Sequence, residues 1–231
     1  MAKILCIETS TTVCSVALTE DEKLLGLEEI SGVNSHSSHL AVCIDKLMKK
    51  TGSVFSEIKA VAVSEGPGSY TGLRIGVSTA KGICFGLDIP LIAIGTLESL
   101  MQMYFVQNQT NYDTLYFPMI DAKRLEVYTQ VFQSDGNKQS ETFPLVFESH
   151  SFEKYLAEKK VVLFGEGSLK AKEIYSSAKI EIVDTVSVSA VGLIHPAFKK
   201  FITGDFVDLA YFEPYYLKEF VAGLPKVKGL Q

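Results

Sequence analysis

The sequence predicts an α/β protein built from two lobes of the same plan. Short runs with the alternating apolar pattern of β-strands are interspersed with amphipathic helical segments along all 231 residues. The order of these segments repeats after the polar stretch QNQTNYD. With 47% hydrophobic residues, a chain of this length can bury a sizeable core. We therefore expect one lobe over residues 1–106 and a second over residues 107–231, which includes a C-terminal tail.

The first half begins with three consecutive strands separated by Thr/Ser-rich and Asp/Glu-rich turns, an arrangement typical of an antiparallel meander. Helices and strands then alternate up to the polar break. The expected strands are 2–8, 13–19, 23–30, 60–64 and 90–95, and the expected helices are 38–50, 71–86 and 96–106.

The second half repeats this order of elements. The expected strands are 113–121, 125–133, 138–147, 161–165 and 180–183, and the expected helices are 151–159, 168–177 and 187–201. Asp135, Gly136 and Asn137 provide the turn between the second and third strands. The order βββαβαβα thus occurs twice, although the letters themselves do not repeat. Two such units predict two RNase-H-like lobes that face each other across a cleft.

The stretch AVAVSEGPGSYTGLRIGVSTAKGICFG places a buried strand, a glycine-rich turn and a long helix in direct succession. The letters GPG favour a tight turn, and Ser69 or Thr71 can cap the helix that follows. Two interpretations are open: a turn that serves packing, or an anion site at the helix N-terminus. The spacing matches neither a Walker A loop nor a dinucleotide-binding loop, and Ser69 is not flanked as in a nucleophile elbow.

Charge and composition limit the classes of function. The net charge is −5 and the sequence pI is about 5.5, so the chain lacks the overall basic field of a stand-alone nucleic-acid-binding protein. The start, MAKILCIETS, is unlike a signal peptide, and no apolar run approaches the ~18 residues of a membrane span. We therefore expect a cytoplasmic protein that binds no membrane. The cysteines lie singly in apolar segments, which favours buried thiols over metal ligands or disulfides.

Four segments resemble the TsaB (YeaZ) family: ILCIETSTTVCSVAL at the start, GPGSYTGLRIGVSTAKG in the middle, IDAKRLEVYTQVF in the second half and FEPYYLKEF near the end. The resemblance implies the fold of the actin, sugar-kinase and Hsp70 group. It also implies a non-catalytic accessory subunit that acts with the paralogous protein TsaD and the ATPase TsaE. Their joint product is threonylcarbamoyladenosine beside the anticodon of tRNAs that read ANN codons, and we expect tRNA to be contacted mainly through the complex.

The alternative is an active enzyme of the same fold that works alone, either a transferase or a glycoprotease-like peptidase. The sequence offers it neither a serine elbow nor a Cys–His pair linked by a motif. The resemblance also implies where a metal would lie, because TsaD-like proteins hold one with an H-x-x-x-H pair after the fifth strand. This chain has IGTLESLMQMYF there, in which Glu98 is the only metal-capable side chain. We therefore expect no catalytic residue and no metal in this chain.

A second metal candidate is the pair His36 and His39 in the letters HSSH. The two histidines lie in a stretch rich in helix-capping side chains, and no acidic ligand is close to them in sequence. We interpret them as solvated or interface histidines.

The resemblance further implies possible nucleotide contacts on both sides of the cleft. In ATP-binding members of the fold group, the first hairpin of each lobe holds the phosphates and Mg²⁺, and a glycine turn lies near the adenosine. The corresponding residues here are Glu8, Thr9, Ser10, Asp121, Gly165 and Gly167. Glu8 is one methylene longer than the family's usual aspartate, and Leu125 stands where the family usually has glycine. We expect no cofactor in the isolated chain and ATP or ADP only in the complex. The alternative for the hairpin residues is an ordinary polar network.

Two expected helices of the first half, 38–50 and 71–86, carry stripes of apolar or small residues. Glycine in a helix interior costs roughly 1 kcal/mol, so repeated glycines indicate that another element approaches closely. The resemblance implies that these helices pair with a second copy of this chain or with TsaD, and the alternative is that the chain's own sheet supplies every contact. The predicted interface residues are Leu40, Cys43, Ile44, Leu47, Leu73, Arg74, Gly76, Val77 and Ala80. We expect a bulky charged residue at Gly76 or Ala80 to weaken association more than folding.

Overall fold

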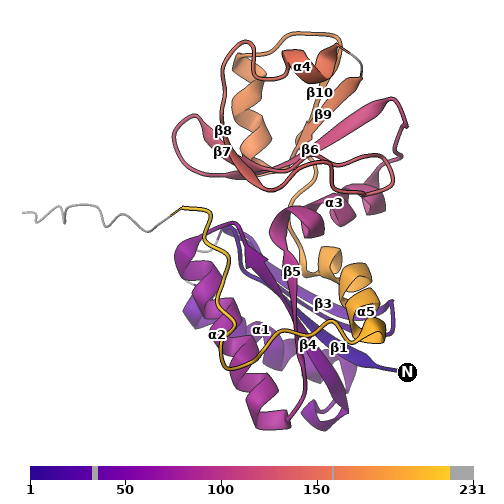
Figure 1. Cartoon of the computed structure of the whole chain (residues 1–231). Helices are drawn as coiled ribbons and strands as arrows, with labels where there is room; N and C mark the ends of the chain where they lie inside the picture. Colours follow the sequence, from indigo (N-terminus) through magenta and orange to yellow (C-terminus); the bar gives the residue numbers. More distant parts are fainter. Residues whose placement is uncertain (33–35, 158, 219–231) are drawn as a thin grey trace, which may run out of the picture.

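A computed structural model describes residues 1–32, 36–157 and 159–218 (Figure 1). It contains two five-stranded sheets, and each sheet forms the centre of one lobe. Helix α3 and the segment that leads to α5 lie where the two lobes meet (Figure 1). The boundary between the lobes is where polar residues from both halves come together.

The first sheet has the strand order β3-β2-β1-β4-β5. Its strands are β1 (Lys3–Glu8), β2 (Cys14–Glu20), β3 (Lys23–Ile30), β4 (Ile58–Gly66) and β5 (Leu91–Gly95). β1 pairs antiparallel with β2 and parallel with β4, and β2 pairs antiparallel with β3, so the first three strands form the expected meander. β1 and β4 are buried along nearly their whole length, which explains why both are almost continuously apolar.

Helical elements cover both faces of this sheet. They are α1 (His36–Thr51), η1 (Phe55–Glu57), α2 (Tyr70–Leu87), η3 (Ala190–Leu193) and α5 (Ile194–Thr203). α1 and α2 bury their apolar stripes against one face, and η3 with α5 buries the other. In the part of the chain that the structure describes, no helix is both long enough and apolar enough to cross a membrane.

The second sheet has the strand order β10-β9-β6-β7-β8. Its elements are β6 (Thr114–Asp121), β7 (Glu126–Thr129), β8 (Phe143–Val146), α4 (Glu153–Leu156), β9 (Lys160–Phe164), η2 (Glu166–Glu173) and β10 (Ile180–Val183). One face packs against α3 (Thr96–Gln107), and the other packs against η2 and the aromatic side chains around α4. The sheet therefore has the same order of pairing as the first one, shifted by five strands.

The two lobes exchange helices. α3 follows β5 of the first sheet, yet Leu100 and Tyr104 pack in one cluster with Tyr116 and Phe164 of the second sheet. α5 comes last in the chain, yet Ala197 belongs to a cluster with strands of the first sheet. The expected division between residues 106 and 107 falls between the two sheets, but the covering helices cross it in both directions.

Several elements of the second lobe are shorter than the sequence indicated. The strand expected over 125–133 ends at Thr129. Beyond this residue, hydrogen bonds to Ser140 replace the regular pairing with the neighbouring strand. Gln130 Nε2 donates to Ser140 O at 2.8 Å, and the Val131 N–H donates to Ser140 Oγ at 3.0 Å. The helix expected over 168–177 is a 3₁₀ helix, η2, and the helix expected over 187–201 begins as the 3₁₀ turn η3. Side-chain and turn hydrogen bonds thus override the hydrophobic periodicity at these places.

The glycine-rich turn and the start of α2 pack directly on the β1–β2 hairpin. The Ser69 N–H donates to Ser10 O at 2.6 Å, and Thr9 Oγ1 donates to Gly72 O at 2.8 Å. A Cβ atom on Gly72 would lie 2.1 Å from Thr9 O, and one on Gly76 would lie 2.2 Å from Thr9 Oγ1. Because the chain's own hairpin occupies the N-terminus of α2, the geometry favours the packing turn over the anion site.

Two glycines of α2 provide a matched test of this packing. We predict that Gly76→Ala lowers the free energy of unfolding by about 1–3 kcal/mol, because the added methyl group collides with Thr9. Gly82→Ala should raise it by up to about 1 kcal/mol, since a Cβ atom at Gly82 meets nothing within 4 Å and alanine is the better helix former. Urea denaturation of both variants measures the difference, and stabilisation by both would contradict the close contact.

Candidate functional site

Glu8, at the end of β1, is completely buried beside the cleft. Its Oε1 accepts hydrogen bonds from the Ser10 N–H at 2.7 Å and from Ser64 Oγ at 2.8 Å. Its Oε2 is buried and has no hydrogen-bond partner among the described residues. Burial raises the pKa of Glu8, and the hydrogen bonds from Ser10 and Ser64 offset only part of this rise. The carboxyl group holds the hairpin in shape, which agrees with the polar-network alternative for this residue.

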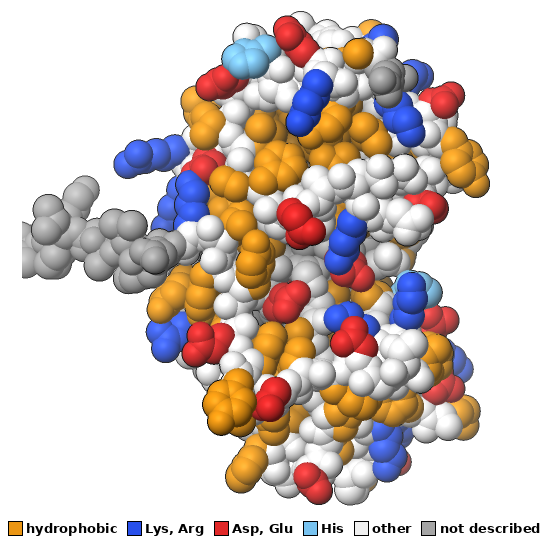
Figure 2. All heavy atoms as spheres, in the orientation of Figure 1, with side chains coloured by type: hydrophobic (Ala, Val, Ile, Leu, Met, Phe, Trp, Pro, Cys, Tyr) orange, Lys and Arg blue, Asp and Glu red, His pale blue; other side chains and the backbone are white. Residues whose placement is uncertain are grey.

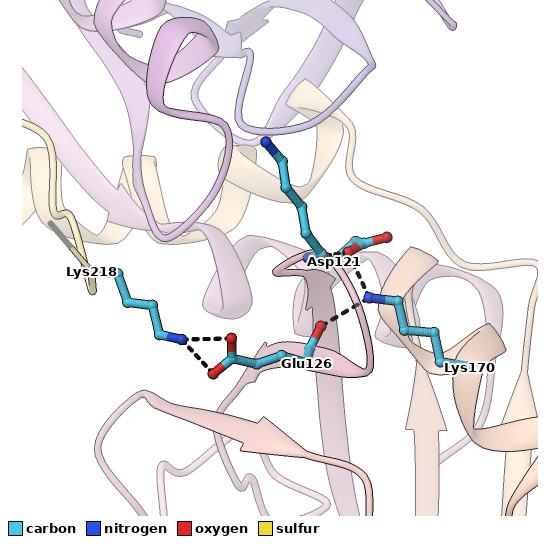
Figure 3. Close-up of polar contacts among 5 residues, drawn as sticks. Asp121, Glu126, Lys170 and Lys218 are labelled. Carbon is cyan, nitrogen blue, oxygen red and sulfur yellow. Dashed lines mark hydrogen bonds and ion pairs between the residues drawn. The ribbon is translucent and has the colours of Figure 1, made fainter. Parts of the chain in front are cut away.

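Asp121 ends β6 on the opposite side of the cleft, and its carboxylate is already engaged. Asp121 Oδ1 accepts from the Lys123 N–H at 2.5 Å and from Lys170 Nζ at 2.6 Å. Lys170 also donates to the Glu126 backbone oxygen at 2.9 Å, so it connects the end of β6 with the start of β7 on the two sides of the turn (Figure 3). No sequence motif links Lys170 to Asp121, because the two residues lie 49 positions apart.

The turn between β6 and β7 forms without glycine. Lys123 and Arg124 have φ values of +70° and +54°, in the left-handed region where glycine is usual. Leu125, which stands where the family usually has glycine, is largely exposed, and its carbonyl accepts from the Phe147 N–H at 3.1 Å.

Gly165 and Gly167 serve close packing. Gly165 has a φ of +93°, and a Cβ atom there would lie 2.5 Å from Met119 O. A Cβ atom on Gly167 would lie 2.8 Å from Val127 Cγ1. Between them, Glu166 is exposed, and partial desolvation together with the nearby Asp121 raises its pKa. The two glycines therefore let η2 lie against β6 and β7.

A pocket of about 720 Å³ opens between the lobes near the ends of β4 and β5. It is lined by Glu65, Gly66 and Gly95 of the first lobe, by Gln130, Lys138, Gln139, Ser140, Glu141 and Thr142 of the second, and by Tyr215 of the C-terminal tail. Burial raises the pKa of Glu65. In Figure 2, charged side chains of both signs lie along the boundary between the lobes. No sequence motif pointed to this pocket, because its walls come from three distant parts of the chain.

The two histidines of HSSH have separate roles. His36 is buried, and its Nε2 forms a 2.7 Å hydrogen bond with Thr11 O, so it supports the β1–β2 hairpin. This corrects the expectation of a solvated or interface residue. His39 Nδ1 lies 3.0 Å from Ser38 Oγ. Within the described residues, no group of three or more His, Cys, Asp or Glu side chains is arranged to hold a metal ion.

The predicted interface residues lie on α1 and α2, but almost all of them face inward. Arg74 is exposed, whereas the other eight are buried in the chain's own core: Leu40, Cys43, Ile44, Leu47, Leu73, Gly76, Val77 and Ala80. A residue buried in this way cannot touch a partner without unfolding the helix from its sheet. The alternative interpretation, that the chain's own sheet supplies the contacts, therefore describes these eight residues.

The outward face of the same helices carries a different set of residues. Phe85 on α2 is 83% exposed and Val42 on α1 is 47% exposed. Gly82 and Gly86 flank Phe85, and a Cβ atom on either would meet nothing within 4 Å. On this face Arg74 Nη1 donates to Tyr70 Oη at 2.9 Å. Large apolar side chains beside bare backbone are typical of a surface that packs against another helix.

Comparisons with known proteins agree on one family. A family model described as "TsaD: tRNA N6-adenosine threonylcarbamoyltransferase" matches residues 29–224. The "tRNA threonylcarbamoyladenosine biosynthesis protein TsaB" of Escherichia coli (strain K12) is 33% identical over 58% of this chain. The protein of that name from Buchnera aphidicola (subsp. Acyrthosiphon pisum, strain APS) is 30% identical over 78% of this chain and 76% of its own length. The match to the Escherichia coli relative spans 57% of that relative's length.

The solved structure of YeaZ from Pseudomonas aeruginosa superposes with a TM-score of 0.79 at 22% identity, and covers 94% of this chain and 100% of that one. Two five-stranded lobes with exchanged helices define a protein of the actin, sugar-kinase and Hsp70 fold group, as the sequence predicted. The chain belongs to the TsaB (YeaZ) family, within the wider family that the TsaD model describes.

The buried carboxyl group of Glu8 leads to a pH prediction. Because its pKa is raised in the folded state, the unfolded chain loses this proton first, and stability falls as the pH rises from about 4.5, the usual value for glutamate, through the folded pKa. We predict that Glu8→Gln removes this loss, so the variant gains melting temperature relative to the parent as the pH increases.

Glu57 is the matched control, because hydrogen bonds from the Val54 N–H and from Lys3 lower its pKa. Glu57→Gln should instead lose melting temperature relative to the parent above about pH 4.5, the usual pKa of a glutamate side chain. Thermal melts between pH 4 and pH 8 compare the three proteins. A constant offset between Glu8→Gln and the parent would show that the pKa of Glu8 is the same in the folded and unfolded chain, and would contradict the raised pKa.

Proposed function

We propose that this chain is a non-catalytic accessory subunit in the formation of threonylcarbamoyladenosine in tRNA, and that it acts together with TsaD and TsaE. The relatives named TsaB support the pathway. The observation that supports the accessory role most directly is the ion pair formed by Glu98 on α3. Its Oε2 pairs with Lys138 Nζ at 2.7 Å, so the one carboxylate in the stretch where TsaD-like proteins hold a metal is already neutralised.

The partner surface in this proposal is the outward face of α1 and α2, with Phe85 at its centre. The same face suits a second copy of this chain or the paralogue TsaD, and the two partners would exclude each other there. Residues that the sequence placed in the interface support this face from beneath, since they fix the two helices on the sheet. An aromatic side chain with an exposed ring supplies the large contact area that dominates interface energetics.

The same proposal covers ligands and location. One oxygen of each carboxylate, Oε1 of Glu8 and Oδ1 of Asp121, already accepts hydrogen bonds from the chain itself, which supports nucleotide binding only in the complex. With a net charge of −5, the chain attracts tRNA weakly at long range, so the complex would supply most of the RNA contacts. We place the protein in the cytoplasm, where these partners and tRNA would meet it.

We predict that the purified chain carries no stoichiometric iron or zinc and forms no threonylcarbamoyladenosine by itself. Adding TsaD, TsaE, threonylcarbamoyl-adenylate and ATP should restore product formation, because the catalytic ligands then come from the paralogue. Elemental analysis and nucleoside analysis of the tRNA measure the two quantities. Product from the chain alone, or one bound metal per chain, would favour the enzyme that works by itself.

We also predict that Phe85→Asp weakens association with TsaD, or with a second copy, at least tenfold, which corresponds to about 1.4 kcal/mol. Its melting temperature should stay within about 2 °C of the parent, because the side chain is exposed. Tyr112→Asp is the matched control, since Tyr112 is 85% exposed but lies on the second lobe. Analytical ultracentrifugation and co-purification report the association. Equal effects of the two substitutions would remove Phe85 from the interface.

A further inference from the structure

The C-terminal segment 205–218 leaves α5 and crosses the first lobe in front of α2 towards the second lobe (Figure 1). It contains no helix or strand, and its only ladder contact is an isolated bridge between Val207 and Leu91 of β5. A segment without regular structure must be held by other contacts. Those contacts differ strongly between its beginning and its end.

The beginning and middle of the segment are fixed to the first lobe by backbone hydrogen bonds. The Val207 N–H donates to Leu91 O at 3.1 Å, and the Tyr215 N–H donates to Glu65 O at 2.7 Å. Between these points, Lys81 Nζ of α2 donates to the carbonyl oxygens of Ala210 at 3.2 Å and Phe212 at 3.0 Å. Val207, Leu209 and Phe212 also pack against the core beneath α2.

The next residues bring the segment to the edge of the lobe. The ring of Tyr216 lies 4.8 Å from the ring of Tyr70, the first residue of α2. Tyr215, one residue earlier, forms part of the wall of the pocket between the lobes. Backbone hydrogen bonds, partly buried apolar side chains and a ring contact therefore attach residues 207–216 to the first lobe.

The last described residue reaches the other lobe. Lys218 Nζ lies 2.5 Å from both carboxylate oxygens of Glu126, the first residue of β7 (Figure 3). The Glu126 side chain is 20% exposed and that of Lys218 is 48% exposed. Lys170 uses the backbone oxygen of Glu126, so it leaves the carboxylate to Lys218 (Figure 3).

We propose that residues 205–218 form a strap that is anchored on the first lobe and latched to the second by the ion pair between Lys218 and Glu126. The anchors are several backbone hydrogen bonds supported by partly buried apolar side chains, whereas the latch is one partly exposed ion pair that salt screens. The latch therefore opens while the anchors hold. Opening it frees the second lobe to move about the α3 junction and widens the pocket that Tyr215 lines.

The test measures the separation of the lobes in the full chain. Spin labels at Lys59→Cys, an exposed position of the otherwise buried β4, and at Glu153→Cys, an exposed position of α4, report one distance across both lobes. The four native cysteines are buried, and burial raises the pKa of Cys6 and Cys14 to about 12, so they react slowly with the label. Pulsed electron paramagnetic resonance then gives the distance distribution.

We expect Lys218→Met and Glu126→Gln each to broaden the distribution and shift it to longer distances. High salt should do the same to the parent and should add little to either variant. The exchanged pair, Glu126→Lys with Lys218→Glu, should restore the narrow distribution. Lys49→Met is the control, because it breaks the exposed pair between Lys49 and Asp45 within α1, far from the strap.

Urea denaturation establishes that each labelled variant is folded before it is measured. Unchanged distributions in Lys218→Met and Glu126→Gln would overturn the latch, and so would equal broadening by Lys49→Met. None of these measurements requires TsaD, TsaE or tRNA, so their outcome is independent of the proposed function.

Discussion

The contact between the β1–β2 hairpin and the start of α2 is the constraint on which the first lobe depends. Thr9 fills the space that side chains at Gly72 and Gly76 would need, and Ser10 fills the space at Gly68. Hydrogen bonds from Ser69 and Thr9 fix the spacing. This contact orients α2, and α2 in turn carries both Phe85 and the lysine that holds the strap. Glu8 supports the same hairpin from its other side through Ser10 and Ser64. The outward face of α2, the attachment of the strap and the edge of the cleft therefore all depend on this contact.

The order of elements in both lobes could be predicted from the sequence, because hydrophobic periodicity and turn residues act locally. The exchange of α3 and α5 could not, since nothing local in either helix distinguishes the two sheets that it can cover. For a similar reason, the interface prediction did not distinguish the buried residues of α1 and α2 from the exposed ones. α2 is apolar or small on most of its circumference, so the periodicity alone does not tell which stripe meets the sheet. Burial of Val77 and exposure of Phe85 answer that question.

Residues of the cleft show a second limit of sequence reasoning. Glu8 and Asp121 could be predicted from their hairpins. Lys170, whose ammonium group pairs with the Asp121 carboxylate, lies 49 positions away in the sequence. Glu65 and Tyr215, which line the pocket, are far apart in the sequence. A motif describes neighbours in sequence, whereas a side chain's charge state depends on neighbours in space. The glycines at 165 and 167 matched a ligand-binding pattern because close packing and close approach of a ligand demand the same residue.

The carboxylates near the boundary between the lobes are engaged by the chain itself. Glu8 is buried and accepts from Ser10 and Ser64 through one oxygen, whereas Asp121 pairs with Lys170 and Glu98 with Lys138. The pairs Lys170–Asp121 and Lys138–Glu98 and the latch Lys218–Glu126 are all partly exposed, so each contributes little stability by itself and is screened by salt. The strap is held at its other end by several backbone hydrogen bonds and by partly buried apolar side chains. The single ion pair to the second lobe therefore breaks more easily than the set of contacts that holds the strap on the first lobe.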